Sequence, residues 1–177
     1  DFFVIFAGFM LWWLFGYIES VGSPFINLHF WGLQTEELAY FGVTTLLGIP
    51  IAFALVPWIT RTFDKRNAII GSSLAYLLLP NIPICLRLLE VPWYPDNSSP
   101  WVLYINLAVS LINAVSGTIA AVTYSSIYAD LTDAHEYRTR HRREGTIFAA
   151  RSFSGKAAGA FGLMIGGVIL DLIAFPR

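Results

Sequence analysis

The sequence has little charge and almost no cysteine. Of its 177 residues, 13% are charged, against roughly 25% in ordinary soluble domains. Cys85 is the single cysteine, which excludes an intrachain disulfide and a cysteine-based metal site. The net charge is -1, and the residues outside the apolar segments do not provide the basic surface that nucleic acid binding needs. Soluble and nucleic-acid-binding classes are therefore disfavoured.

Catalytic patterns are also missing. The three histidines, His29, His135 and His141, stand in different connections or span ends, and neither a nucleophile elbow nor a phosphate-binding glycine loop is present. We therefore expect no enzyme activity, no metal site and no cofactor. The chain begins with Asp1 and lacks a signal-peptide pattern, so we interpret it as a fragment of a longer protein.

Long apolar runs are what the sequence does contain. Hydrophobic residues make up 56% and aromatic residues 16% of the chain. A membrane-crossing helix needs about 20 apolar residues, and the runs between polar segments reach that length. We predict an all-α integral membrane protein with five transmembrane helices, at about residues 2–33, 38–60, 67–89, 101–129 and 146–173.

The charges of the connections predict their orientation. Residues 61–66 contain Arg61, Lys65 and Arg66, and residues 130–145 contain four arginines. The connections 34–37 and 90–100 carry acidic residues instead. The positive-inside rule then makes 61–66 and 130–145 cytoplasmic loops and places the N-terminus of the chain in the cytoplasm. We expect a multi-pass protein of the cell membrane, surrounded by lipid.

Topology alone does not explain the acids within residues 130–145. Arginines would suffice to hold this loop inside, yet it also carries Asp130, Asp133, Glu136 and Glu144. One interpretation is that these acids form ion pairs that latch neighbouring helices together. The other is an ordinary charged loop in solvent.

The first predicted span is unusually long, at about 32 residues where about 20 are needed. Its outer half contains Glu19, Gly22 and Pro24. One interpretation is a broken helix of the kind that transporters use at binding sites, with Glu19 as a cavity acid. The other is that the span ends near Ile18 and continues as an outer loop.

Lys156 is the most informative single residue. It lies about 15 Å into its span, counted from Thr146 at about 1.5 Å per residue, and so near the bilayer midplane. Lysine there costs about 2.5–3.5 kcal/mol, so it should face a water-filled cavity or a carboxylate. The alternative is a fixed ion pair between two helices. Arg151, only about 7.5 Å in, is close enough to the interface to snorkel.

Two stripes of small or polar residues follow helical spacing. The first, in the last span, consists of Ser152, Gly155, Gly159, Gly162 and Gly166. We predict that it packs helices closely, with a sliding surface as the alternative. The second, in the span 101–129, consists of Asn106, Ser110, Asn113, Gly117 and Tyr124. It predicts either an aqueous cavity wall or interhelical hydrogen bonds.

The run YADLTDAHEYRTRHRREGTIFAARSFSGK, residues 128–156, resembles the glycoside-pentoside-hexuronide:cation symporters, the melibiose permease-like branch of the major facilitator superfamily. The residues that match the family pattern are Asp130, Asp133, Glu136, Arg142, Glu144 and Lys156. The run TRTFDKR, residues 60–66, resembles the family's basic loop between its eighth and ninth helices.

This resemblance implies a fold and a function. The chain would supply helices seven to eleven, from the C-terminal six-helix half of a twelve-helix transporter, and would work with the missing N-terminal half and last helix. The implied function is symport of a sugar or glycoside with a cation by alternating access. The cation coupled to sugar transport would be Na⁺ or H⁺, and its binding site would lie mainly in the missing N-terminal half. We expect a bacterial inner membrane protein.

The resemblance also suggests which residues act. We predict a substrate and cation cavity formed by Lys156, Asn113, Tyr124, Glu19 and Ser152. We predict a cytoplasmic gate formed by Asp130, Asp133, Glu136, Arg142 and Glu144, whose ion pairs would close the inner side in the outward-facing state.

One departure leaves the substrate open. Ala121 stands where melibiose permease has a tryptophan, so galactoside specificity does not follow. A carrier of lysolipid or another non-sugar solute on the same fold is one alternative. A non-transporting membrane scaffold is the other.

Overall fold

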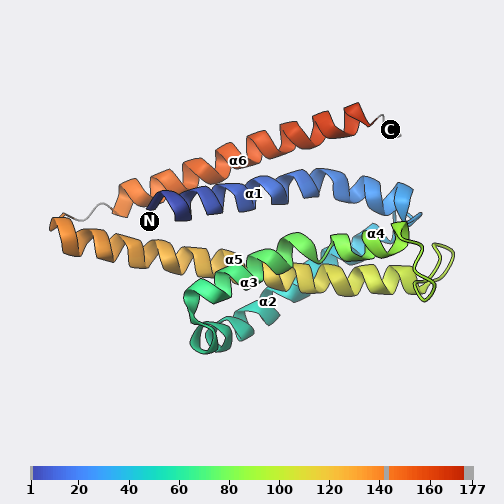
Figure 1. The fold of residues 1–177 in the computed structure, drawn as a ribbon, viewed down its shortest axis with the longest axis horizontal. Coiled ribbons are helices and arrows are strands. Elements are labelled where there is room, and N and C mark those ends of the chain that lie inside the picture. The colour runs from blue at the N-terminus through green and yellow to red at the C-terminus, as the bar shows by residue number, and fades with distance from the viewer. Residues whose placement is uncertain (1, 142–143, 174–177) are drawn as a thin grey trace. The chain divides into compact units, whose positions relative to one another are not determined.

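The computed structural model describes residues 2–141 and 144–173. In this part of the chain every regular element is helical, which confirms the predicted all-α class (Figure 1). The elements are α1 (Phe2–Phe25), the π-helix η1 (Ile26–Phe30), α2 (Leu38–Thr62), α3 (Asp64–Leu78), α4 (Asn81–Leu88), α5 (Trp101–Thr139) and α6 (Glu144–Leu172).

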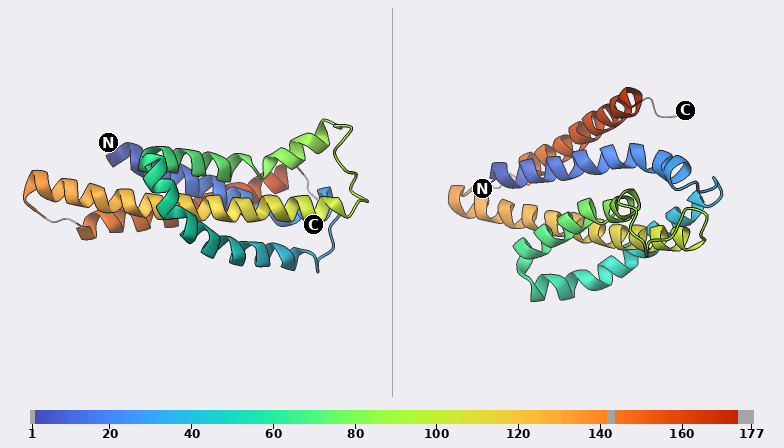
Figure 2. Two further views of the ribbon diagram at one scale, coloured as in Figure 1. Left: turned by 90° about the horizontal axis from the view of Figure 1, so that it is seen from below. Right: turned by 45° about the vertical axis from the view of Figure 1, so that its right-hand side comes forward.

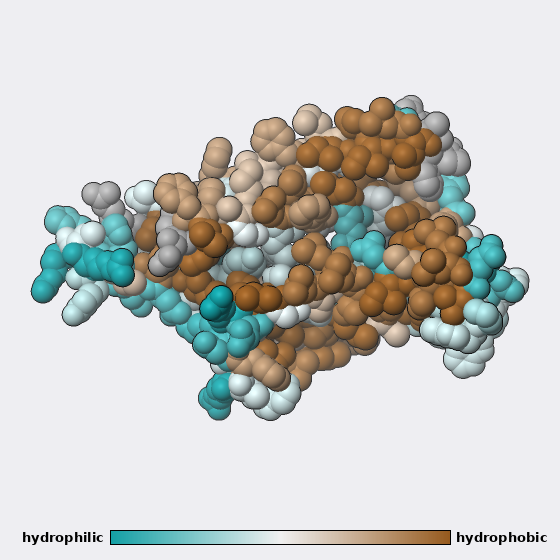
Figure 3. Space-filling model, in the orientation of Figure 1, coloured by the Kyte–Doolittle hydropathy of each residue, from teal (hydrophilic) through white to brown (hydrophobic). Residues whose placement is uncertain are grey.

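Within the described residues, four helical segments are long and apolar enough to cross a membrane. They are Phe3–Phe30, α2, α5 and α6, and the bent pair α3 and α4 makes a fifth when counted as one span. Hydrophobic side chains remain exposed along these helices, for example Leu163, Met164 and Leu172 of α6. Figure 3 shows such side chains in brown along the helices. The protein is a multi-pass membrane protein.

The chain divides into two compact units. The first contains the chain up to Pro24 and from Tyr124 onward, so it holds α1, the end of α5, and α6. The second runs from Phe25 to Thr123 and holds η1, α2, α3, α4 and the first part of α5.

In the first unit, α6 runs beside α1 (Figure 2). The two helices meet at glycines of α6. A Cβ at Gly159 would lie 3.1 Å from the Tyr17 ring, and one at Gly166 would lie 2.9 Å from the Val21 side chain. Small residues allow such close approach where no hydrophobic effect drives helices together. The packing predicted for the glycine stripe is therefore present, although Ser152 is exposed and lies outside it.

In the second unit, α5 packs closely on α2 and α3. A Cβ at Gly48 of α2 would lie 2.7 Å from Ala114 Cβ, and one at Gly117 would lie 2.8 Å from the Tyr76 ring. Two connections and the start of α5 form a small core around Trp31, Tyr94 and Val102, which are 2%, 8% and 1% exposed.

The first span has no break near Gly22 and Pro24. Helix α1 continues through Pro24 to Phe25, and η1 extends it to Phe30, closed by the Trp31 N–H donating to the Ile26 carbonyl at 3.0 Å. Proline lacks an N–H and its ring crowds the carbonyl four residues earlier. The wide π turn begins at Ile26, two residues after that proline. The suggested loop after Ile18 is also wrong, because this segment is helical.

A break occurs instead in the third span, which we predicted as one helix over 67–89. Helix α3 ends at Leu78, α4 begins at Asn81, and the two are bent by 43°. Pro80 stands at this point and cannot donate a helical hydrogen bond. The bent helix of this fragment is therefore the third span and not the first.

Helix α5 continues to Thr139, whereas we predicted that it would end at Ala129. Most of the expected loop 130–145 is thus helical, and α6 begins at Glu144. Residues 130–139 contain neither glycine nor proline, so nothing stops the helix there. It ends where Arg140 adopts a left-handed φ of 58° and donates its N–H to the Glu136 carbonyl at 2.8 Å.

Candidate functional sites

The first unit holds an arginine among aromatic rings. The guanidinium carbon of Arg151 lies 5.4 Å from the Phe9 ring centroid, 5.6 Å from that of Tyr128 and 6.0 Å from that of Phe148. Its Nη2 donates to Ser125 Oγ at 2.8 Å. Aromatic faces attract cations without neutralising them. Arg151 therefore contacts α1, α5 and its own helix, which the snorkelling interpretation did not anticipate.

The rings around Arg151 belong to a larger aromatic cluster. Phe9 lies 5.3 Å from Tyr124 and 5.6 Å from Tyr128 between ring centroids, and Trp12 lies 5.7 Å from Tyr124. Tyr124, a predicted cavity residue, is only 8% exposed and packs among these rings. The sequence signal for this cluster was Tyr124 and Tyr128, four residues apart on one helix face.

Lys156 and Ser152 are both exposed on α6, one turn apart and hence on the same face. Glu19, on α1, is half-buried. Within the part of the chain that the structure describes, no hydrogen bond or ion pair joins these three side chains to one another. Their roles in a cavity remain predictions.

Asn113 lies in the second unit, and its Oδ1 atom is buried without a hydrogen-bond partner among the described residues. Two other members of its stripe form hydrogen bonds, one of them between helices. Ser110 Oγ shares a 2.9 Å hydrogen bond with Thr44 Oγ1 of α2, and Asn106 Nδ2 donates to the Val102 carbonyl of its own helix at 2.9 Å. The buried Asn113 Oδ1 is thus an unused acceptor within the described part of the chain.

The predicted gate residues occupy helix ends. Asp130, Asp133 and Glu136 lie in the last turns of α5, and Glu144 is the first residue of α6. Residues three apart are neighbours on a helix surface, so the three α5 acids form one acidic strip. Arg142 lies outside the described residues. The gate remains a prediction.

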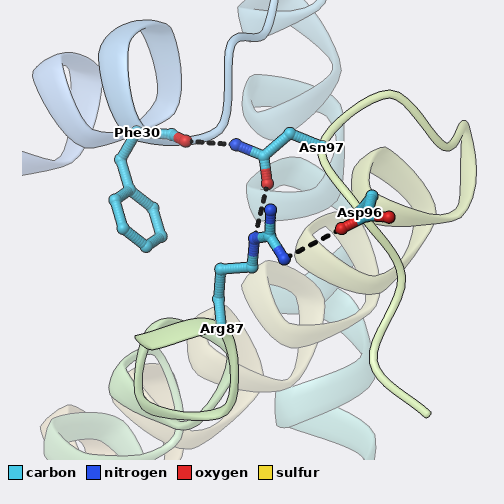
Figure 4. A network of polar contacts seen from close by, with 4 residues as sticks. All are labelled: Phe30, Arg87, Asp96 and Asn97. Atoms are coloured by element: carbon cyan, nitrogen blue, oxygen red, sulfur yellow. Dashed lines mark hydrogen bonds and ion pairs between the residues drawn. The ribbon is translucent and has the colours of Figure 1, made fainter. Parts of the chain in front are cut away.

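Sequence reasoning missed a polar network in the second unit (Figure 4). Arg87, in the last turn of α4, donates Nη1 to Asp96 Oδ1 at 3.0 Å and Nε to Asn97 Oδ1 at 3.1 Å. Asn97 Nδ2 in turn donates to the Phe30 carbonyl at 2.6 Å. The network ties the end of η1 to the end of α4 and to the connection before α5. The sequence signal was an arginine ending one span, followed by an Asp-Asn pair in the next connection.

A cavity of about 660 Å³ lies beside this network. Its lining includes Phe30, Arg87, Glu90, Tyr94, Asp96 and Asn97. Tyr94 is 8% exposed, and its hydroxyl has no hydrogen-bond partner among the described residues. Burial raises the pKa of the Tyr94 phenol, while the nearby Arg87 charge acts in the opposite direction. The phenol is therefore protonated at neutral pH.

Comparisons with known proteins agree with the resemblance drawn from residues 128–156. The whole chain, residues 1–177, matches the family described as MFS/sugar transport protein. The uncharacterized symporter YnaJ of Bacillus subtilis (strain 168) is 30% identical over 159 residues, which cover 89% of this chain and 31% of that protein. The chain therefore spans less than a third of that relative's length. No solved structure matches this chain.

The family match extends over every helix described above, and these helices supply up to five membrane spans, as the family resemblance required. The expected family is confirmed. The chain belongs to the MFS/sugar transport family of membrane proteins.

Proposed function

We propose that the full protein containing this chain is a secondary transporter that moves a sugar or glycoside together with a cation by alternating access. The observation that carries this proposal is the family match over the whole chain, supported by the similarity to a protein named as a symporter. In this proposal the chain contributes part of the transport path and depends on helices outside it. It uses no cofactor other than the coupling ion.

The exposed face of α6 that carries Ser152 and Lys156 lines the solute cavity in this proposal. Lysine facing lipid in the middle of a span would cost about 2.5–3.5 kcal/mol, and no described residue neutralises Lys156. A water-filled cavity, or a carboxylate from the rest of the protein, removes that cost. Glu19, Asn113 and Tyr124 are the further cavity candidates.

The coupling cation is Na⁺ or H⁺, and its ligands lie mainly in the N-terminal half of the full protein. Residues 61–66, which we predicted as a loop, are helical except for Phe63, since α2 ends at Thr62 and α3 begins at Asp64. In this proposal the basic junction of α2 and α3 and the basic end of α5 near Arg140 face the cytoplasm, because positive residues favour that side. The N-terminus of the chain is then also cytoplasmic, and we place the protein in a bacterial inner membrane.

The gate works at this cytoplasmic side. The acids of the α5 strip and Glu144 pair with arginines such as Arg142 when the transporter opens outward, and these pairs break when it opens inward. Charge is concentrated at this end of α5 because the pairs form and break there.

The test is uptake of labelled glycosides and pentoses by the full-length protein in proteoliposomes, with and without an inward Na⁺ or H⁺ gradient. We compare wild type with two variants. Lys156→Met keeps a long unbranched side chain but removes its charge, and Lys156→Arg keeps the charge. Equal insertion of all three is verified first. We expect gradient-driven uptake that is lost in Lys156→Met and partly retained in Lys156→Arg.

Other outcomes point elsewhere. Absence of uptake for every sugar, with uptake of lysolipid or another solute, would favour a non-sugar carrier on the same fold. Absence of transport for all solutes would favour a scaffold. Unchanged sugar uptake by Lys156→Met would reduce Lys156 to a structural residue.

A further inference from the structure

The cavity beside Arg87 has the form of a small-molecule site. Its volume of about 660 Å³ lies within the roughly 300–1,000 Å³ typical of ligand pockets. All of its lining residues belong to the second unit, from the end of η1, the end of α4 and the connection before α5. The Phe30 and Tyr94 side chains supply aromatic surface, and Arg87, Glu90, Asp96 and Asn97 supply polar groups.

The polar wall of this cavity is organised in advance. Arg87 is held by both Asp96 and Asn97, and Asn97 is anchored on the Phe30 carbonyl (Figure 4). The chain turns sharply at Glu90, which adopts a φ of 50° after α4, and the Val91 N–H donates back to the Leu86 carbonyl at 3.3 Å. Side chains fixed in this way lose little freedom when a ligand binds.

Two groups of the wall have unused hydrogen-bonding capacity. The Glu90 carboxylate is exposed and has no hydrogen bond or ion pair with the described residues. The Tyr94 hydroxyl is buried and unpartnered in the same part of the chain. The carboxylate accepts hydrogen bonds, and the phenol can donate or accept one.

The charges of the wall restrict the ligand. Two carboxylates, of Glu90 and Asp96, face one guanidinium, of Arg87, so the lining has a net negative charge and disfavours anions. Sugars present hydroxyl groups for carboxylates and amides, and C–H faces for aromatic rings. By the positive-inside rule, this connection lies on the outer side of the membrane.

We propose that this cavity is a peripheral binding site for a neutral sugar, which captures the solute at the outer surface apart from the transport cavity. Glu90 accepts hydrogen bonds from sugar hydroxyls, the Tyr94 hydroxyl forms a further one, and Phe30 or Tyr94 packs on the C–H face. The choice of ligand class rests on the proposed transport function.

The test is sugar binding to the full-length protein in nanodiscs, measured by saturation-transfer difference NMR. Glucose, galactose, xylose and melibiose are the neutral probes, and glucuronate is the anionic one. All variants carry Lys156→Met to weaken binding in the transport cavity. Glu90→Gln and Tyr94→Phe are the test variants, since neither touches the Arg87 network. Glu36→Gln, an exposed acid of another connection, is the matched control.

We expect at least one neutral sugar to bind in the Lys156→Met background and glucuronate to bind more weakly. Glu90→Gln and Tyr94→Phe should each weaken neutral-sugar binding about two- to tenfold, as for loss of one hydrogen bond, while Glu36→Gln leaves it unchanged. Unchanged thermal transitions of the variants verify that the fold is intact.

The proposal is overturned if no neutral sugar binds in this background, or if both test variants bind like Glu36→Gln. The two proposals fail separately. Gradient-driven uptake without binding that depends on Glu90 rejects the peripheral site alone. Binding that depends on Glu90 without any uptake rejects the transport function and leaves the site.

Discussion

Gly162 of α6 lies directly against Tyr17 of α1. A Cβ at Gly162 would be 2.6 Å from Tyr17 Cβ and 2.9 Å from the Leu14 carbonyl oxygen, closer than real Cβ atoms approach. The two helices therefore meet at this point because glycine has no side chain. Without a hydrophobic effect between helices in lipid, such backbone contact is a principal source of their association.

Gly162→Ala should force α1 and α6 apart. We expect the free energy of unfolding of the full-length protein in detergent micelles to fall by about 1–3 kcal/mol, as for other overpacked positions. Gly167→Ala is the control, because a Cβ there would meet nothing within 4 Å. Equal stability of the two alanine variants would contradict the tight contact.

Phe9 and Arg151 should be energetically coupled. A double-mutant cycle with Phe9→Leu and Arg151→Met should give a coupling of about 0.5–2 kcal/mol, because the ring stabilises the guanidinium. The measurement is chemical unfolding of the four proteins in mixed micelles. A control cycle combines Phe9→Leu with Arg138→Met, because Arg138 is exposed. The effects of these two substitutions should be additive. Additive effects in both cycles would mean that Arg151 gains nothing from the ring.

Asn97→Asp should loosen the connection before α5. The substitution keeps the acceptor for Arg87 but replaces the donor to the Phe30 carbonyl with an oxygen that repels it. We expect a loss of about 0.5–1.5 kcal/mol and faster amide hydrogen exchange in residues 89–100. Ser98→Ala, also exposed in this connection, is the control. Asp96→Asn should cost less than about 1 kcal/mol, because its ion pair is largely exposed.

Glu144→Gln and Arg142→Gln should each weaken the proposed gate. We expect both variants to be more open to the cytoplasm and to transport more slowly, because each lacks one charge of a closing pair. The measurement is labelling of an engineered cysteine in the transport cavity by a membrane-impermeant thiol reagent from the inner side, in a Cys85→Ser background. Lys65→Gln, in the first turn of α3, is the control. Labelling and uptake that both match wild type would rule out the gate.

The membrane class and family could be predicted from the sequence, because the length of apolar runs and a local charged pattern carry that information. The bend at Pro80 was missed because it interrupts a run that is apolar on both sides. The end of α5 was misplaced because the charge of residues 130–139 was taken as evidence for a loop. Charge marks where a segment leaves lipid, whereas glycine and proline mark where a helix stops.

The aromatic setting of Arg151 could not be predicted from local patterns. It joins Phe9, Ser125, Tyr128 and Phe148, which come from three separate helices. The network of Arg87 likewise depends on the Phe30 carbonyl, a backbone group that no residue type reveals. Both depend on contacts between residues distant in sequence, which composition and periodicity do not encode.

The 39 residues of α5 make a helix about 58 Å long, well beyond the roughly 30 Å of a bilayer core. The acidic strip formed by Asp130, Asp133 and Glu136 therefore stands on a helical extension and not on a pliable loop. Because all three carboxylates are attached to one helix, rotation or tilting of this segment displaces them together. A movement of this helical extension should therefore alter the surroundings of all three carboxylates at once.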